Sequence, residues 1–273
     1  MSWVDIFRDG VELRGRDEGA GLPVVFQHGL GGDEAQAAEV FPDGFRRLTL
    51  DCRGQGRSQL GDPSALSMAT FADDVLAFAD RRGLGRFVVG GISMGAAIAL
   101  HLAICHPERI LGLILARPAW LWQAAPANMH PYVEVADHLR SADLRTARAA
   151  FERSPTARHL GEIAPDNLAS LLRFFDAANP VDLASLLKAI AKDGPQVSEA
   201  QVRSIAVPTL VLGTEIDAVH PLDLARELAG RIPNAQLVEI TPKATDRQRY
   251  VEEFRAALAR FLSSLKRTEG NAA

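Results

Sequence analysis

The sequence Gly91-Ile92-Ser93-Met94-Gly95 stands between an apolar run, residues 87–90, and an alanine-rich run, residues 96–105. The first run predicts a strand and the second a helix. A sharp strand-to-helix turn forces the middle residue of Gly-x-Ser-x-Gly into strained geometry and exposes its hydroxyl. The helix directs its N-terminus at the same place, where it can stabilise a developing negative charge. The stretch predicts a nucleophilic Ser93; a glycine-rich turn for close helix packing is the alternative.

Predicted strands and helices alternate on both sides of this turn. Residues 3–16 read as a hairpin, a helix is expected at 67–82, and strands are expected at 22–26, 47–50, 86–90 and 110–116. This alternation favours a doubly wound, mostly parallel sheet covered by helices on both faces. Ligands bind at the carboxyl ends of such strands. Four residues just past strand ends should therefore gather at one edge of the sheet: His28, Asp51, Ser93 and Arg117.

The pattern changes after Arg117, where strand signals disappear and prolines punctuate an Ala-, Leu- and Arg-rich stretch. We interpret residues 118–204 as an inserted helical cap. Its helical segments are expected near 130–140, 143–152, 166–176 and 182–192. The sheet resumes at 207–213 and ends at 235–240, and the last helix is expected at 246–264. The predicted organisation is a core of residues 1–117 and 205–265, the cap, and a flexible tail, 266–273.

The composition is that of an ordinary globular protein, with 47% hydrophobic and 23% charged residues. A net charge of −4 gives no support for a nucleic-acid partner or an anionic membrane surface, and no apolar run is long enough to span a bilayer. Residues 1–5 show no start of a secretory signal. The two cysteines form neither a metal-type pattern nor a disulfide framework. We expect a cytoplasmic protein without metal or cofactor, acting on a small-molecule substrate.

Four motifs occur in a fixed order: His28-Gly29, Asp51-x-Arg53-Gly54-x-Gly56-x-Ser58, Gly91-x-Ser93-x-Gly95 and Gly213-x-x-x-Asp217. In their order and spacing the chain resembles the α/β-hydrolase superfamily over nearly its whole length. Its spacing is most similar to that of the capped esterases, lactonases and proline iminopeptidases. The resemblance implies an α/β-hydrolase fold with an inserted helical cap.

The resemblance also implies roles for individual residues. Ser93 would be the nucleophile and Asp217 the acid of a catalytic triad. The backbone N–H groups of Met94 and Leu30 would form the oxyanion hole. Three further residues would be structural: His28, which supports the oxyanion loop, and Asp51 and Arg53, as a buried pair that fixes its own loop.

The family's third triad member, a histidine after the last strand, is absent. Residues 240–247 read Ile-Thr-Pro-Lys-Ala-Thr-Asp-Arg, and no histidine follows His220. The expected position falls near Ala244 or Thr245, and neither side chain can act as a base. A serine hydroxyl is a poor nucleophile at neutral pH without an adjacent base.

Three explanations compete. In the first, another histidine substitutes, and His220 is the first choice because it follows Asp217 by three residues near a helix start; it could instead pack against or cap that helix. The cap also carries His130, His138 and His159.

In the second explanation, Lys243 and Arg117 form a cationic site for a carboxylate or phosphate, or Lys243 acts as the base. The alternative is that both are surface charges, with Lys243 paired to Asp246.

The second explanation would suit C–C bond cleavage or acyl or carboxyl transfer. The third explanation is a binding protein that has lost catalysis.

Trp120, close to Arg117, could line an apolar pocket wall or pack within the cap. The sequence predicts a serine-type hydrolase for an ester, lactone or activated carbonyl of a small molecule, which can be anionic. Ser93, Asp217 and His220 would be catalytic, and Arg117, Trp120 and Lys243 would bind substrate.

Overall fold

A computed structural model describes residues 3–270, with side chains to Lys266. These residues contain an eight-stranded sheet in the order β1-β2-β4-β3-β5-β6-β7-β8. The strands are β1 (Trp3–Arg8), β2 (Val11–Glu18), β3 (Pro23–Gln27), β4 (Arg46–Leu50), β5 (Phe87–Ile92), β6 (Ile110–Ala116), β7 (Thr209–Gly213) and β8 (Ala235–Glu239). The hairpin β1–β2 joins antiparallel to β4, and all later pairs are parallel.

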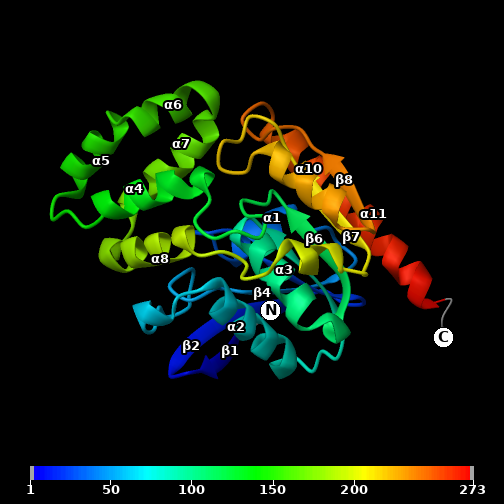
Figure 1. Ribbon diagram of the computed structural model, residues 1–273. Helices are drawn as coiled ribbons and strands as arrows, with labels where there is room; N and C mark the ends of the chain where they lie inside the picture. The colour runs from blue at the N-terminus through cyan, green and yellow to red at the C-terminus, as the bar shows by residue number, and fades with distance from the viewer. Residues whose placement is uncertain (1–2, 271–273) are drawn as a thin grey trace.

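Helices cover both faces of the sheet, because successive apolar residues of each inner strand point in opposite directions. In β3, Val25 belongs to one buried cluster, whereas Val24 and Phe26 belong to the other. The first face is covered by α2 (Met68–Arg81), α3 (Met94–Cys105) and α10 (Leu222–Arg231), and the second by α1 (Glu34–Val40) and α11 (Arg247–Gly270). The predicted doubly wound, mostly parallel α/β fold is confirmed (Figure 1).

The connection between β6 and β7 contains helices and no strand among its residues, all of which are described. Its elements are η3 (Ala127–Met129), α4 (His130–His138), α5 (Leu144–Glu152), α6 (Pro155–Ile163), α7 (Pro165–Leu172), η4 (Arg173–Asp176), α8 (Pro180–Lys192) and α9 (Glu199–Arg203). Figure 1 shows α4 to α8 grouped beside the sheet. The prediction that residues 118–204 form a separate cap stays a prediction.

Several boundaries differ from the sequence prediction. Helix α1 was not predicted, since it has only seven residues and its signal is the Asp33 N-cap, whose side chain accepts from the Ala35 N–H. Pro221 suits the first position of a helix, but helix α10 begins one residue later, at Leu222, with Pro221 as its N-cap. Helix α11 continues to Gly270, so the predicted end at residue 264 was too early. Of the predicted tail, residues 271–273 lie outside the described part.

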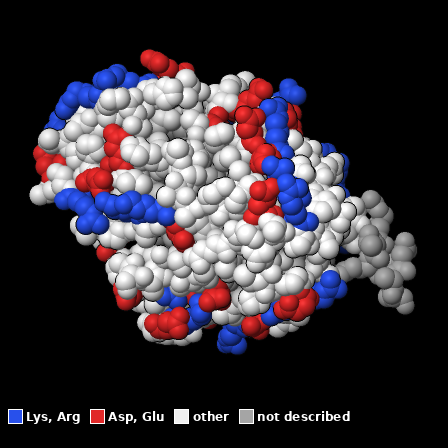
Figure 2. All heavy atoms as spheres, in the orientation of Figure 1, with Lys and Arg blue, Asp and Glu red and all other residues white. Residues whose placement is uncertain are grey.

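Charges of both signs are interspersed on the face of the molecule shown in Figure 2. Within residues 3–270, no helix combines the length and apolar character that crossing a bilayer requires. The absence of nucleic-acid and membrane partners and the cytoplasmic location stay predictions.

Candidate active site

Ser93 occupies the turn between β5 and α3 with φ 56° and ψ −110°, a backbone conformation rarely adopted by a residue with a side chain. The backbone packs closely around this turn and leaves no space for a side chain on either flank. A Cβ added to Gly91 would lie 2.6 Å from the Gln27 carbonyl oxygen, and one added to Gly95 would lie 2.5 Å from the same atom. Glycine is therefore needed on both sides of Ser93, as the Gly-x-Ser-x-Gly pattern predicts.

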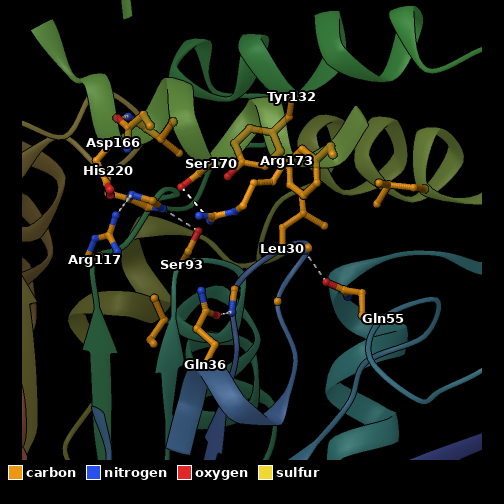
Figure 3. Close-up of a pocket in the computed structure, with 18 of the residues that line it drawn as sticks. Leu30, Gln36, Gln55, Ser93, Arg117, Tyr132, Asp166, Ser170, Arg173 and His220 are labelled. Carbon is orange, nitrogen blue, oxygen red and sulfur yellow. Dashed lines mark hydrogen bonds between the residues drawn. The ribbon is translucent and has the colours of Figure 1, made fainter. Parts of the chain in front are cut away.

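The loop after β7 carries both Asp217 and His220. The Asp217 carboxylate accepts a hydrogen bond from the His220 backbone N–H at 3.0 Å, which closes a tight turn before α10. The same carboxylate lies 2.9 Å from His220 Nδ1, and His220 Nε2 lies 2.9 Å from Ser93 Oγ. The three-residue spacing thus places the Asp217 carboxylate at one ring nitrogen of His220 and the Ser93 hydroxyl at the other. Figure 3 shows His220 turned toward Ser93.

Two side chains from other elements of the fold hold Asp217. Arg117 donates from Nε and Nη2 to Asp217 Oδ2 at 2.9 and 2.6 Å, and its Nη1 donates to the Tyr250 hydroxyl at 3.4 Å. Asn167 donates to Asp217 Oδ1 at 3.0 Å and accepts from the Ala218 N–H at 2.7 Å. The loop is therefore fastened to both β6 and α7.

These contacts bear on the substrate-binding role predicted for Arg117, which stays a prediction. Its guanidinium lies at the pocket wall but is occupied by Asp217, so the ion pair takes the position in which a substrate carboxylate would bind. The residue has φ 46°, a left-handed backbone conformation at the end of β6. The sequence places Arg117 at the correct edge of the sheet but does not reveal its partner.

The charges in this cluster fix its protonation. Burial disfavours the ionised carboxylate of Asp217, but Arg117 and His220 outweigh it and hold the pKa of Asp217 well below its usual range. Burial lowers the pKa of His220 from its ordinary value of 6.5; Asp217 opposes this effect and the Arg117 charge adds to it. At neutral pH, a neutral His220 donates from Nδ1 to Asp217 and presents the lone pair of Nε2 to Ser93.

The loop after β3 brings backbone N–H groups to the same place. The Gly29 N–H donates to Gln36 Oε1 and the Gly31 N–H donates to Gln55 Oε1, each at 2.7 Å. Leu30 lies between these two anchored amides and lines the pocket. Met94 is the first residue of α3, so its N–H has no acceptor within the helix. The roles of the Leu30 and Met94 N–H groups as oxyanion donors stay predictions.

His28 fixes the base of this loop. Its Nδ1 lies 2.8 Å from the Gly29 carbonyl oxygen, and its Nε2 accepts from the Cys52 N–H at 3.0 Å. Burial lowers the pKa of His28, which fits a neutral ring that donates from Nδ1. The ring connects the loops after β3 and β4, in agreement with the structural role predicted.

The predicted pairing of Asp51 with Arg53 is wrong. Arg53 is 2% exposed and binds Asp74 of α2 through two hydrogen bonds of 2.7 and 2.9 Å. Asp51 instead accepts from the backbone N–H groups of Glu34 and Arg57. Asp74 lies 21 residues after Arg53 in the sequence, so the actual partner of Arg53 has no local sequence signal.

A cavity of about 340 Å³ opens over Ser93. Lys243 lines it, with Nζ 3.4 Å from Asp166 Oδ2, so its partner is Asp166 and not Asp246. The wall role predicted for Trp120 is wrong: its side chain is 2% exposed, does not line the cavity, and donates from Nε1 to the Asp193 carbonyl at 3.0 Å. An indole beside a polar loop is equally suited to core packing.

Sequence reasoning missed the residues that α7 and η4 contribute to the cavity. Asp166, Ser170 and Arg173 recur at intervals of four and three residues, so they share one face of the helical stretch. Asn167 lies next to that face, and Tyr132 of α4 completes the wall. The helical periodicity of these polar residues is a signal, but it does not indicate which face is turned to Ser93. Among the described residues, no group of His, Cys, Asp and Glu is arranged to hold a metal ion.

A family model described as alpha/beta hydrolase fold matches residues 23–244, most of the chain. The chain belongs to the α/β-hydrolase fold family. RutD of Rhizobium rhizogenes, which is named as a candidate carbamate hydrolase, is 28% identical to it over 238 residues, 83% of this chain and 86% of RutD. Because its homologues include hydrolases, the prediction of a hydrolase is confirmed at that level.

Solved structures agree with this assignment. An esterase from Thermogutta terrifontis is 27% identical, with a TM-score of 0.71 covering 96% of this chain and 99% of the esterase. An enol-lactonase from Burkholderia xenovorans is 25% identical, with a TM-score of 0.71 covering 95% of this chain and 100% of the lactonase. Relatives of this α/β-hydrolase thus carry names that refer to carbamate, ester and lactone hydrolysis.

Proposed function

We propose that this α/β-hydrolase is a serine hydrolase that cleaves an ester, lactone or activated carbonyl of a small molecule. Ser93 is the nucleophile, His220 the general base, and Asp217 the acid that orients His220. The proposal rests on the 2.9 Å separation of His220 Nε2 from Ser93 Oγ, with Asp217 at Nδ1 of the same ring. That distance is within the range for proton transfer.

In the first half-reaction, Ser93 Oγ attacks the substrate carbonyl carbon while His220 Nε2 takes the hydroxyl proton. The carbonyl oxygen becomes an oxyanion, for which the N–H groups of Leu30 and Met94 are the donors. The C–O bond to the leaving group then breaks, and His220 returns the proton to the departing oxygen. An acyl group remains on Ser93.

In the second half-reaction, His220 takes a proton from water, and the hydroxide oxygen attacks the acyl carbon. Collapse of the second oxyanion breaks the bond to Ser93 Oγ, which regains the proton from His220. The ionised Asp217 stabilises the imidazolium that forms in both halves. A depressed pKa keeps His220 in the base form at neutral pH.

The lysine–arginine alternative has less geometric support, because both cations are engaged by carboxylates: Arg117 by Asp217 and Lys243 by Asp166. We also propose that residues 118–204 act as a cap, since α7 contributes Asn167 to the acid and further residues to the cavity wall. A cavity of about 340 Å³ between this cap and the Ser93 edge of the sheet suits a small substrate.

Labelling with a fluorophosphonate probe, followed by mass mapping, tests the nucleophile and the base together. Wild type should be labelled at Ser93, and Ser93→Ala should not be labelled there. His220→Ala should be labelled far more slowly, whereas the control His130→Ala, at an exposed position, should react like wild type. Labelling of His220→Ala at the wild-type rate would show that the base is elsewhere.

A further inference from the structure

Four side chains with a formal charge line the cavity: Arg117, Asp166, Arg173 and Lys243. Three of them are neutralised by ion pairs, Arg117 with Asp217 and Lys243 with Asp166. Among the described residues, no carboxylate forms an ion pair with Arg173. The cavity therefore carries one positive charge that no carboxylate of the described residues balances.

The position of Arg173 directs this charge into the site. It is the first residue of η4, directly after α7, and its Nη2 donates to Ser170 Oγ at 3.2 Å. Figure 3 shows the Arg173 side chain extending from the helical layer, the group of helices α4 to α8, into the cavity on the side of Ser93 and Ser170. Only one of its five N–H donors has a partner among the described residues, and the others remain available for a ligand.

Tyr132 adds a neutral donor beside Arg173. Its ring packs against Phe174 with centroids 5.8 Å apart, and the residue is 8% exposed. No hydrogen-bond partner for its hydroxyl occurs within the described residues. Burial and the Asp217 charge raise the pKa of Tyr132 to about 12, so the hydroxyl keeps its proton. Both side chains line the same cavity wall.

We propose that Arg173 and Tyr132 form a carboxylate subsite, and that the natural substrate is a small carboxylate-bearing ester or lactone. The inference rests on the proposed hydrolase function. Guanidinium groups bind carboxylates through paired N–H donors, and a phenol hydroxyl can donate to a carboxylate oxygen. A phosphate group would bring a charge of about −1.5 to −2, which a single guanidinium does not balance.

The subsite also assigns an orientation. Ser93 and the oxyanion donors lie on the sheet side of the cavity, whereas Arg173 and Tyr132 come from the helical layer above it (Figure 3). A substrate would place its scissile carbonyl at Ser93 and its carboxylate at the opposite wall. The small cavity limits the spacer between the two groups to a few carbon atoms.

A matched pair of esters tests the proposal: 4-nitrophenyl hydrogen glutarate, which carries a carboxylate, and methyl 4-nitrophenyl glutarate, in which that group is neutral. Wild type should have the higher kcat/KM on the carboxylate ester. Arg173→Gln should lose about 10- to 100-fold on that ester and change less than about twofold on the methyl ester. Tyr132→Phe should show the same selectivity with a smaller loss. Arg140→Gln, at an exposed position away from the cavity, is the matched control.

The proposal is overturned if Arg173→Gln leaves both esters unchanged or lowers both equally, since either result would mean that Arg173 does not contact the carboxylate. A binding measurement separates this failure from failure of the hydrolase function. Monomethyl glutarate should raise the melting temperature of Ser93→Ala, and the rise should disappear when Arg173→Gln is added. That result without any turnover or labelling of Ser93 would keep the subsite and reject the hydrolase. The absence of a rise in Ser93→Ala would reject the subsite.

Discussion

The loops after β7 and β8 begin at the same edge of the sheet. Only the loop after β7 places an imidazole ring within hydrogen-bond distance of Ser93. The loop after β7 carries Asp217 and His220 within one turn, and His220 Nε2 lies 2.9 Å from Ser93 Oγ. The loop after β8 carries Lys243, whose Nζ lies 3.4 Å from Asp166. The histidine that the resemblance places after β8 is replaced, in the proposed mechanism, by His220 in the loop one strand closer to the centre of the sheet.

Strand order explains why this substitution is geometrically easy. Ser93 follows β5, β7 lies two strands away and β8 three. Neighbouring strands are about 4.8 Å apart, so a base on the β8 loop has one more strand spacing to cross. The hydrogen bond from the His220 N–H to Asp217 folds the β7 loop back and brings the ring over Ser93. Whether a histidine can serve as the base therefore depends on the distance between its ring and Ser93, and not on whether it follows β7 or β8.

The largest expected effect is that of His220→Ala. Loss of the base should lower kcat/KM on an activated ester by about 10⁴-fold, because the remaining rate comes from binding and the oxyanion donors alone. Steady-state kinetics with 4-nitrophenyl esters measure this loss, and far-ultraviolet circular dichroism checks the fold. A reduction of less than tenfold would remove His220 from the mechanism.

Adding Thr245→His to His220→Ala sharpens the comparison between the two loops. Little activity should return, because Thr245 is exposed and Asp217 is held on the β7 side by Arg117 and Asn167. Recovery to near wild-type kcat/KM would mean that both loops can supply the base and that the β7 geometry is not needed.

Arg117→Met should change both stability and pH dependence. Removal of one partner of a buried ion pair costs about 3–5 kcal/mol of unfolding free energy. Arg117 helps to lower the pKa of His220, so its removal raises that pKa. Catalysis needs neutral His220, and kcat/KM is lost as pH falls through its pKa. The acid limb should therefore lie below pH 6.5 in wild type and move to higher pH in the variant.

The pH profile of kcat/KM gives the direction of this shift, and Arg140→Gln is the control for loss of an exposed arginine. An acid limb that stays in place or moves to lower pH in Arg117→Met would contradict the electrostatic account of His220.

Asn167→Ala tests whether the helical layer holds the β7 loop. The change removes the donor to Asp217 Oδ1 and leaves the Ala218 N–H without its 2.7 Å acceptor. We expect a stability loss of about 1–3 kcal/mol and a fall in kcat, with a smaller effect than His220→Ala. Chemical denaturation and kinetics measure the two effects. A variant that loses stability while keeping wild-type kcat would give Asn167 a structural role alone.

The sequence predicts the sheet edge well because its signals are local. The Gly-x-Ser-x-Gly pattern encodes a turn in which each glycine meets backbone, and the apolar runs around it mark β5 and β6 to within a few residues. The position of Asp217 follows from the end of β7. Each of these predictions depends on neighbours within a few residues along the chain.

The helical layer was harder to predict because its useful signals were weak or came from distant partners. Ser154-Pro155 and Ser198-x-x-Gln201 are N-terminal helix signals that mark α6 and α9, but the prolines were interpreted only as breaks. The cavity role of Arg173 depends on how α7 is rotated over the sheet, and Arg53–Asp74 joins residues from separate elements. No local pattern carries that information.

The smallest expected effect is that of Lys243→Met, which keeps most of the side-chain stem and removes the charge. Lys243 and Asp166 are each partly exposed, and such ion pairs contribute about 0–1 kcal/mol. We expect kcat/KM on the neutral ester to change by less than about threefold and the acid limb to remain in place. Asp166→Asn is the matched control, because it breaks the same pair from the other side. A loss above a hundredfold in Lys243→Met alone would make the β8 loop the source of the base, which would reverse the comparison of the two loops.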